Sequence, residues 1–311
     1  MPRVLVKTLD MPREEWLSYR RKGIGGSDAA TICGLNPYSS LIALYADKMG
    51  LLPDKDDTEA MRIGRDLEEY VAKRFCEATG KKVKRRNAIF QHEVYDFITA
   101  NIDREVVGEN AGLECKTTSV FNKNDFENGE ISLNYLCQCR HYMNVMGYDR
   151  MYLAVLVLGK GFYWYTIEYD KSEGEALLGL EVDFWQRHIE KNICPEPDGS
   201  ESAAEALKHI YKDASPTGEM MISNDDVPAQ YVSISQEIKS LKGKMEKLKQ
   251  LIVSELAGAQ SGFSVNYSIS NKSTQRSTVD SKLLKARYPK VYNDVLKTTS
   301  TTRFTVSERK E

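Results

Sequence analysis

The sequence contains no long apolar run and shows no sign of a secretory leader. Its longest apolar stretch, around Met151 to Leu158, has the length of a strand, whereas a membrane-spanning helix needs roughly 18 or more apolar residues. The first ten residues hold no apolar core followed by a small-residue cleavage site. We therefore expect a soluble intracellular protein that has no membrane partner.

Cysteine and histidine are both scarce, and neither is arranged as a metal site. The cysteines form no Cys-x-x-Cys pair and no regular framework; they are Cys33, Cys76, Cys115, Cys137, Cys139 and Cys194. We therefore expect reduced thiols rather than disulfides or a zinc site. The four histidines stand at unrelated spacings, and we expect His141 on the surface of a helix. The glycines of residues 23–26 lack the Gly-Lys-Ser/Thr ending of a phosphate-binding P-loop.

Charge is nearly balanced over the whole chain but is unevenly distributed along it. The formal net charge is −2, with 28% charged and 41% hydrophobic residues, which is typical of a globular protein rather than a nucleic-acid coat. From Tyr231 onward there are 15 basic and 7 acidic residues, while residues 1–230 contain 28 basic and 38 acidic ones. A basic tail on an acidic body suits a local contact with DNA or a partner, and equally suits a solvated helical appendage.

Periodicity divides the chain into a mixed body and a helical extension. Apolar residues at helical spacing predict helices over residues 40–49, 59–79, 132–146, 172–191, 202–211 and 229–257. Strand-like runs cover residues 82–91, 97–104, 112–118, 151–158 and 162–168. We expect an α/β (α+β) fold with a central mixed sheet flanked by helices. Three regions are expected, namely a body in residues 1–195, a linker with a short helix in 196–228, and a basic helical extension in 229–311.

The most informative chemistry lies in two of the expected strands. Residues two apart in a strand project on the same face, so Glu114 and Lys116 should point together, and Asp103 on the preceding strand can reach that face. Two carboxylates beside a lysine suit phosphodiester hydrolysis, because carboxylates hold Mg²⁺ and the metal acidifies the attacking water. The alternative is a surface hairpin with alternating charges.

The flanking helices strengthen the hydrolytic interpretation. Glu68 follows core-facing Leu67 on the helix before the sheet. Gln138 and Tyr142 are four residues apart on the helix after it, and therefore share one face. Glu68, Gln138 and Tyr142 are therefore candidate site residues beside the two strands.

The order of these residues resembles that of a known nuclease superfamily. An Asp, then Glu-x-Lys, then Gln-x-x-x-Tyr, preceded by a helix with Gly-x-x-Leu-Glu, resembles the PD-(D/E)xK superfamily with its restriction-endonuclease-like core. A more specific match is W-x-x-x-R-x-x-G-I-G-G-S-D from Trp16 to Asp28, which resembles YqaJ-type viral recombinases and the lambda exonuclease group. The resemblance spans roughly residues 12–195.

The resemblance implies a role for each matching residue. Metal ligands would be Asp103, Glu114, the backbone carbonyl of Cys115 and, directly or through water, Glu68. Lys116 would be the catalytic lysine, with Gln138 and Tyr142 lining the site. Arg20 and Ser27 match positions that hold the 5′-phosphate of a DNA end, and a cation beside a hydroxyl suits that anion. Arg21 is a rival for Arg20, although the four-residue spacing from Trp16 favours Arg20.

The activity implied by the resemblance is a Mg²⁺-dependent 5′-to-3′ exonuclease, with Mn²⁺ as a substitute metal. It would resect linear double-stranded DNA ends for recombination, as a ring-shaped trimer working with a single-strand annealing protein. Its place would be the cytoplasm of a bacterial host cell, encoded by a phage or prophage. Cys115 departs from the commoner apolar residue between Glu and Lys, and the cysteines lack the clustering that an iron–sulfur cluster needs.

Other functions remain open at this level. The same core could serve a structure-selective or nicking endonuclease, or a DNA-end-binding scaffold without catalysis. The basic strip Lys81 to Arg86 suits phosphate contacts, and equally suits a solvated edge strand guarded by lysines. The lysine-rich helix over 229–257 could dock the annealing partner or DNA, or could brace the nuclease body.

Overall fold

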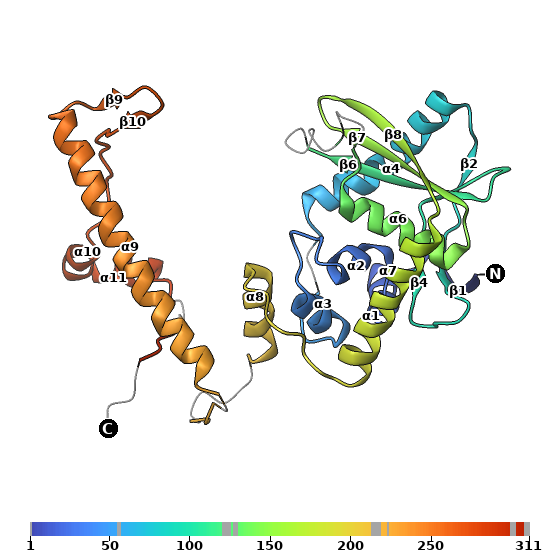
Figure 1. The fold of residues 1–311 in the computed structure, drawn as a ribbon, viewed down its shortest axis with the longest axis horizontal. Helices are drawn as coiled ribbons and strands as arrows, with labels where there is room; N and C mark the ends of the chain where they lie inside the picture. Colours follow the sequence, from blue (N-terminus) through green and yellow to red (C-terminus); the bar gives the residue numbers. More distant parts are fainter. Residues whose placement is uncertain are drawn as a thin grey trace. The chain divides into compact units, whose positions relative to one another are not determined.

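The chain divides into two compact units, Met1–Ser215 and Pro216–Glu311 (Figure 1). The computed structural model describes residues 2–54, 57–119, 126, 130–212, 219–222, 224–298 and 303–307. We refer to the first unit as the body. No helix in these described ranges is long and apolar enough to cross a membrane.

The body is built on a five-stranded mixed sheet. Its strand order is β2-β5-β6-β7-β8, with bounds Val83–Lys84, Arg104–Val106, Ala111–Thr118, Arg150–Val157 and Gly161–Glu168. β6 and β7 pair in parallel, while the other neighbours are antiparallel. The parallel pair needs a crossover, which α6 (Leu133–Met146) supplies. This architecture, with a helical C-terminal region, confirms the expected mixed α/β fold class.

Period-two alternation in β7 builds a core on each face of the sheet. Tyr152 and Ala154 face α4 (Glu59–Thr79), where Val71 and Phe75 are fully buried. The intervening residues, among them Leu153, face α6 on the other side. Because both faces are covered, β7 is apolar almost throughout, as expected of a central strand in a parallel pair.

Two of the expected strands are each divided between separate sheets. The run over residues 82–91 forms β2 and β3 (Ala88–Gln91), because Asn87 adopts a positive φ of 42° that breaks the extended chain. The run over residues 97–104 contributes β4 (Thr99–Ala100) to one sheet and the start of β5 to the other. β3 and β4 join β1 (Arg3–Lys7), which the sequence pattern did not predict, in a three-stranded sheet of order β1-β3-β4.

A group of helices completes the body, and all of them except α1 contribute residues to a further apolar cluster. They are α1 (Arg13–Arg21), α2 (Gly26–Ile32), α3 (Leu41–Lys48), α7 (Lys171–Phe184), its π-helical continuation Trp185–Glu190, and α8 (Glu201–Ile210). Ala203 and Ala206 of α8 are buried in that cluster, and Ser202 accepts a hydrogen bond of 3.1 Å from the Ser40 backbone N–H at the start of α3. The short helix expected within 196–228 therefore packs on the body.

Gly23 allows the segment between α1 and α2 to approach the three-stranded sheet. A Cβ atom at Gly23 would lie 2.5 Å from the Phe97 carbonyl oxygen. The neighbouring Ile24 forms a parallel bridge with Ile98 and is fully buried. The first glycine of the Gly-Ile-Gly-Gly motif is therefore required for close backbone contact.

The second unit consists of a long helix and short elements. They are α9 (Asp226–Leu256), β9 (Ser261–Phe263), β10 (Ser268–Ser270), α10 (Ser281–Arg287) and α11 (Pro289–Val295). β9 and β10 form an antiparallel pair. α9 agrees with the helix expected over 229–257 and begins three residues earlier.

Phe75 should be a principal contributor to the stability of the body. Its fully buried ring lies 5.2 Å from the Tyr152 ring and 6.1 Å from the Trp164 ring, measured between centroids. We expect Phe75→Ala to lower the free energy of unfolding by about 3–5 kcal/mol, through lost transfer energy and a residual cavity. Lys73→Ala on the solvent side of the same helix should cost less than about 0.5 kcal/mol. Urea unfolding of both variants measures this difference, and equal stability would contradict it.

Candidate active site

The expected constellation on β5 and β6 is assembled in the structure. Asp103, directly before β5, accepts a hydrogen bond of 2.7 Å from the backbone N–H of Cys115 through Oδ2. Glu114 and Lys116 do point to one face of β6, and Lys116 Nζ lies 2.7 Å from Glu114 Oε1. Glu114 is only 3% exposed, so its charge lies inside the body.

α6 supplies the opposite wall of the site. Gln138 donates through Nε2 to Glu114 Oε1 at 2.7 Å and to the Tyr142 hydroxyl oxygen at 2.9 Å. The i, i+4 spacing of Gln138 and Tyr142 thus places both beside Glu114, as the sequence predicted. Tyr135, one turn earlier, holds its ring 5.3 Å from Lys116 Nζ. Sequence reasoning missed this aromatic contact.

Glu68 is held at the edge of the site by an arginine that sequence reasoning also missed. Arg104 donates to Glu68 Oε1 at 2.5 Å, to the Asp103 carbonyl oxygen at 2.7 Å and to Glu69 Oε2 at 3.0 Å. Arg104 is only 3% exposed. A charged residue at an inward-facing position of β5, between two acids, was the available signal in the sequence.

The electrostatics of the site favour a cation. Burial raises the pKa of Asp103 well above its ordinary value, and the charges of Glu114 and Glu68 raise it further. Burial alone would lower the pKa of Lys116, but Glu114 and Asp103 outweigh it, and the pKa is raised. The second carboxylate oxygen of Glu114, Oε2, is buried and has no hydrogen-bond partner. A buried carboxylate oxygen without a partner, beside the half-buried Asp103, fits a hard divalent ion such as Mg²⁺.

The carboxylates do not, however, form a closed metal cage. Within the described ranges, no three His, Cys, Asp or Glu side chains are grouped so as to hold a metal ion. The carboxylate of Glu68 is paired with Arg104. The donors that converge are Asp103 and Glu114, and Glu68 adds negative potential from its place beside Arg104.

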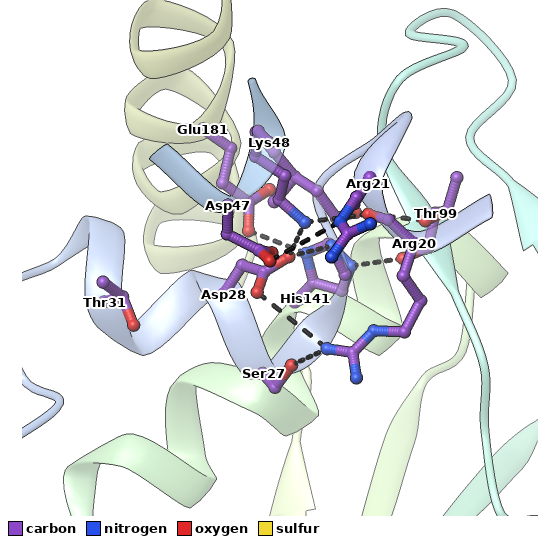
Figure 2. Close-up of polar contacts among 12 residues, drawn as sticks. Arg20, Arg21, Ser27, Asp28, Thr31, Asp47, Lys48, Thr99, His141 and Glu181 are labelled. Carbon is purple, nitrogen blue, oxygen red and sulfur yellow. Dashed lines mark hydrogen bonds and ion pairs between the residues drawn. The ribbon is translucent and has the colours of Figure 1, made fainter. Parts of the chain in front are cut away.

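The candidate phosphate-binding residues also come together. Arg20 donates a hydrogen bond to the Ser27 hydroxyl (Figure 2). Its guanidinium lies 4.8 Å from the centre of the Trp16 ring. Arg21 turns elsewhere, forming an ion pair with Asp54 and lying 3.7 Å from Asp47. The structure therefore pairs Arg20, and not Arg21, with Ser27.

A buried ion pair fixes the backbone around Arg20. Lys48 of α3 donates to Asp28 Oδ2 at 2.6 Å and to the carbonyl oxygen of Arg20 at 2.8 Å. Asp28 also accepts from the Gly25 backbone N–H at 2.9 Å. Although burial opposes ionisation, the charges of Lys48 and Arg20 lower the pKa of Asp28. The final Asp of the Gly-Gly-Ser-Asp motif is thus a structural anchor, which the sequence pattern alone did not reveal.

His141 lies inside the body, so its expected place on a helix surface is wrong. Its ring is fully buried, with Nδ1 2.7 Å from Glu181 Oε1 and Nε2 2.7 Å from the carbonyl oxygen of Thr99 (Figure 2). Burial opposes its protonation, but Glu181 outweighs that cost and raises the pKa of His141. The pair ties α6 to α7 and to β4, one residue away from Tyr142.

Gly26 allows the helix that carries Ser27 to lie against the helix that carries Gln138 and Tyr142. A Cβ atom at Gly26 would lie 2.5 Å from Cε1 of Tyr142 and 3.0 Å from Cγ of Gln138. The last glycine of the motif therefore lets α2, which carries Ser27 and Asp28, pack directly on the site face of α6. One motif thus places both groups of polar residues.

The chain is similar to a defined family of proteins. Residues 15–149 match the model of the YqaJ-like viral recombinase domain. The chain is 40% identical over 310 residues to the uncharacterized protein YqaJ of Bacillus subtilis (strain 168), covering 98% of this chain and 97% of that protein. The chain therefore belongs to the YqaJ-like viral recombinase family, which confirms the resemblance seen in the sequence.

Solved structures with a similar arrangement include two exonucleases. An alkaline exonuclease (LHK-Exo) from Laribacter hongkongensis aligns with a TM-score of 0.44 at 19% identity, over 58% of this chain and all of that one. A phage-related exonuclease from Haemophilus somnus 129PT aligns with a TM-score of 0.43 at 13% identity, over 55% of this chain and 96% of that one.

The close contact at Gly26 gives a direct test of the packing that assembles the site. Gly26→Ala should lower the free energy of unfolding by about 1–3 kcal/mol, because the added methyl group displaces the buried Tyr142 ring. Gly64→Ala is the matched control, because a Cβ atom at Gly64 in α4 would meet nothing within 4 Å. That variant should be neutral or stabilising by up to about 1 kcal/mol. The measurement is denaturant unfolding of both variants. A free energy of unfolding for Gly26→Ala equal to that of the wild type would show that α2 does not pack this closely on α6.

Proposed function

We propose that the protein is a divalent-metal-dependent nuclease that hydrolyses DNA phosphodiester bonds. The observation that carries the proposal is the joining of Asp103, Glu114 and Lys116 on neighbouring strands, with one buried oxygen of Glu114 left without a partner. Membership of a viral recombinase family supports DNA as the substrate. A buried and a half-buried carboxylate beside a lysine suit a phosphate diester, because the acids can hold a metal and the lysine places a fixed cation near the reacting phosphate.

Each residue of the site then has a defined task. Asp103 and Glu114, with the backbone carbonyl of Cys115, would hold Mg²⁺ or the substitute Mn²⁺, and Glu68 would join them directly or through water. When bound, the metal supplies a Lewis acid that acidifies water and offsets charge on the phosphate. Lys116, held against Glu114, orients the attacking water or stabilises charge at the scissile phosphate. Gln138 fixes the Glu114 carboxylate, and Tyr142 fixes Gln138.

The family resemblance supplies the proposed direction of digestion, and the second group of residues supports it. Arg20 and Ser27 form a cation and hydroxyl pair of the kind that binds a terminal phosphate, and Asp28 with Lys48 fixes the backbone that carries Arg20. Anchoring a 5′-phosphate there would make the enzyme a 5′-to-3′ exonuclease that leaves a 3′ single strand for recombination. The family resemblance extends this to a ring-shaped trimer, a single-strand annealing partner and the cytoplasm of a bacterial host.

The test is digestion of linear double-stranded DNA labelled separately at each 5′ and 3′ end, with Mg²⁺ or EDTA. We expect early release of the 5′ label as a mononucleotide, only with the metal. Lys116→Met should reduce release at least about a hundredfold, because it removes the fixed cation while leaving the apolar stem. DNA binding by Lys116→Met should persist.

The other outcomes separate the alternatives. A circular plasmid cut as fast as its linear form would identify an endonuclease. Binding without release from any end, at any metal concentration, would identify a scaffold and contradict the proposed hydrolysis.

Arg20 should determine the preference for phosphorylated ends. Arg20→Ala should lower the digestion rate on 5′-phosphorylated DNA roughly ten- to a hundredfold, because a charge-assisted hydrogen bond contributes that much. The rate on 5′-hydroxyl DNA should be nearly unaffected. Arg21→Ala is the matched control, since Arg21 is paired with Asp54 and Asp47. The measurement is the ratio of the initial digestion rates on 5′-phosphorylated and 5′-hydroxyl DNA for each variant. An equal loss on both kinds of end would remove Arg20 from the phosphate site.

A further inference from the structure

α9 carries an uninterrupted coiled-coil pattern. Eight of its large apolar residues follow one another at alternating steps of four and three, which is the heptad spacing of a helix that packs along a second helix. They are Val227, Tyr231, Ile234, Ile238, Leu241, Met245, Leu248 and Ile252, and we call them the α9 seam.

The α9 seam is exposed along its length, with one aromatic contact at its start, where the ring of Tyr231 lies 5.5 Å from that of Phe304 between centroids. No residue of α9 is buried, and the exposed fractions at its centre are 56% for Ile234, 52% for Leu241 and 64% for Met245. Soluble proteins rarely leave a contiguous apolar surface of this extent in water unless it is an interaction site. A helix of 31 residues is about 46 Å long, and helices in water gain most of their stability from packing an apolar face. The seam therefore requires a helical partner.

We propose that α9 pairs with α9 of a second copy of this chain as an antiparallel two-stranded coiled coil. The inference concerns the second unit alone and holds whether or not the body is a nuclease. The partner and its direction follow from the charges that flank the seam and from the order of the side chains along it.

The flanking charges favour the antiparallel arrangement. One flank of the seam carries Glu237 and Lys244, and the other carries Lys242 and Lys249. In a fully overlapped antiparallel pair, heptad geometry places Glu237 opposite Lys244 of the second copy, and symmetry repeats this contact. Lys242 then faces Ser235, so no lysine opposes a lysine.

A parallel pair would contain both attractive and repulsive contacts between charged side chains. There Glu237 would face Lys242 of the second copy, but Lys244 would face Lys249, and charges of like sign at the flanks select against a pairing. Attraction and repulsion would then offset each other. The signs of these side chains therefore choose between the two directions.

The side chains of the α9 seam also fit those of a second α9 seam that runs in the opposite direction. Full antiparallel overlap places Val227 against Ile252 of the second copy, Tyr231 against Leu248, Ile234 against Met245, and Ile238 against Leu241. Each layer then combines two side chains of different shape, and no tyrosine has to stack on its own copy. Such alternation fills the space between helices more evenly than identical layers do.

The first measurement is the mass of the full-length chain by sedimentation equilibrium. The double variant Ile238→Lys/Leu241→Lys places charges at the centre of the α9 seam and should halve the mass of the assembly. Val253→Lys is the control, because Val253 is an exposed apolar residue of the same helix that lies off the seam. It should leave the mass unchanged. A wild-type chain no heavier than the double variant would overturn the proposal, because it would place the seam against the chain itself or against another protein.

Cysteine cross-linking then tests the direction in the full-length chain. Ile234→Cys and Met245→Cys are prepared separately and oxidised with diamide, alone and mixed. Antiparallel pairing predicts a disulfide dimer only in the mixture, because residue 234 lies opposite residue 245 of the second copy. Each variant cross-linking by itself would mean a parallel pair, and no cross-link in any sample would mean no pair; both results overturn the proposal. The wild type, whose described cysteines are all buried or half-buried, and Val253→Cys are the controls.

Discussion

The buried carboxylate of Glu114 is the interaction on which the rest of the site depends. A charge placed inside a protein is tolerated only when partners compensate for the lost hydration. Lys116 and Gln138 both bind the same oxygen of Glu114, while the other oxygen is left open. The sheet supplies the lysine, and α6 supplies the amide. The position of α6 on the sheet is thus set by chemistry as well as by the apolar core.

A second constraint joins this site to the N-terminal helices. α2 reaches α6 only because Gly26 has no side chain, and Asp28 of the same helix is bound by Lys48. The segment that carries Arg20 and Ser27 is therefore attached to the helix that carries Gln138 and Tyr142. In the proposed function, this frame sets the distance between the terminal phosphate and the scissile phosphate of one DNA strand.

The sequence predicted the parts of the site that depend on local periodicity. Glu114 and Lys116 share a face because strands repeat every two residues, and Gln138 and Tyr142 share one because they are four apart in a helix. Three pairs were not predicted, namely Arg104 with Glu68, Asp28 with Lys48, and His141 with Glu181. Their partners are brought together by packing between elements distant in the sequence, which no local pattern encodes. The same limit explains the misplaced His141, whose polar ring gives no signal of burial.

The His141 and Glu181 pair also has a consequence for the order in which the protein is made. Glu181 lies forty residues after His141, near the end of α7, and its carboxylate accepts from a ring that is fully buried beside Tyr142. While a ribosome is still synthesising α7, the imidazole of His141 has no carboxylate to accept its hydrogen bond, and burying the ring between α6 and β4 is costly. The site face of α6 therefore settles only after α7 has emerged, so a chain whose synthesis stops before α7 would not release a fragment with an assembled site into the cell.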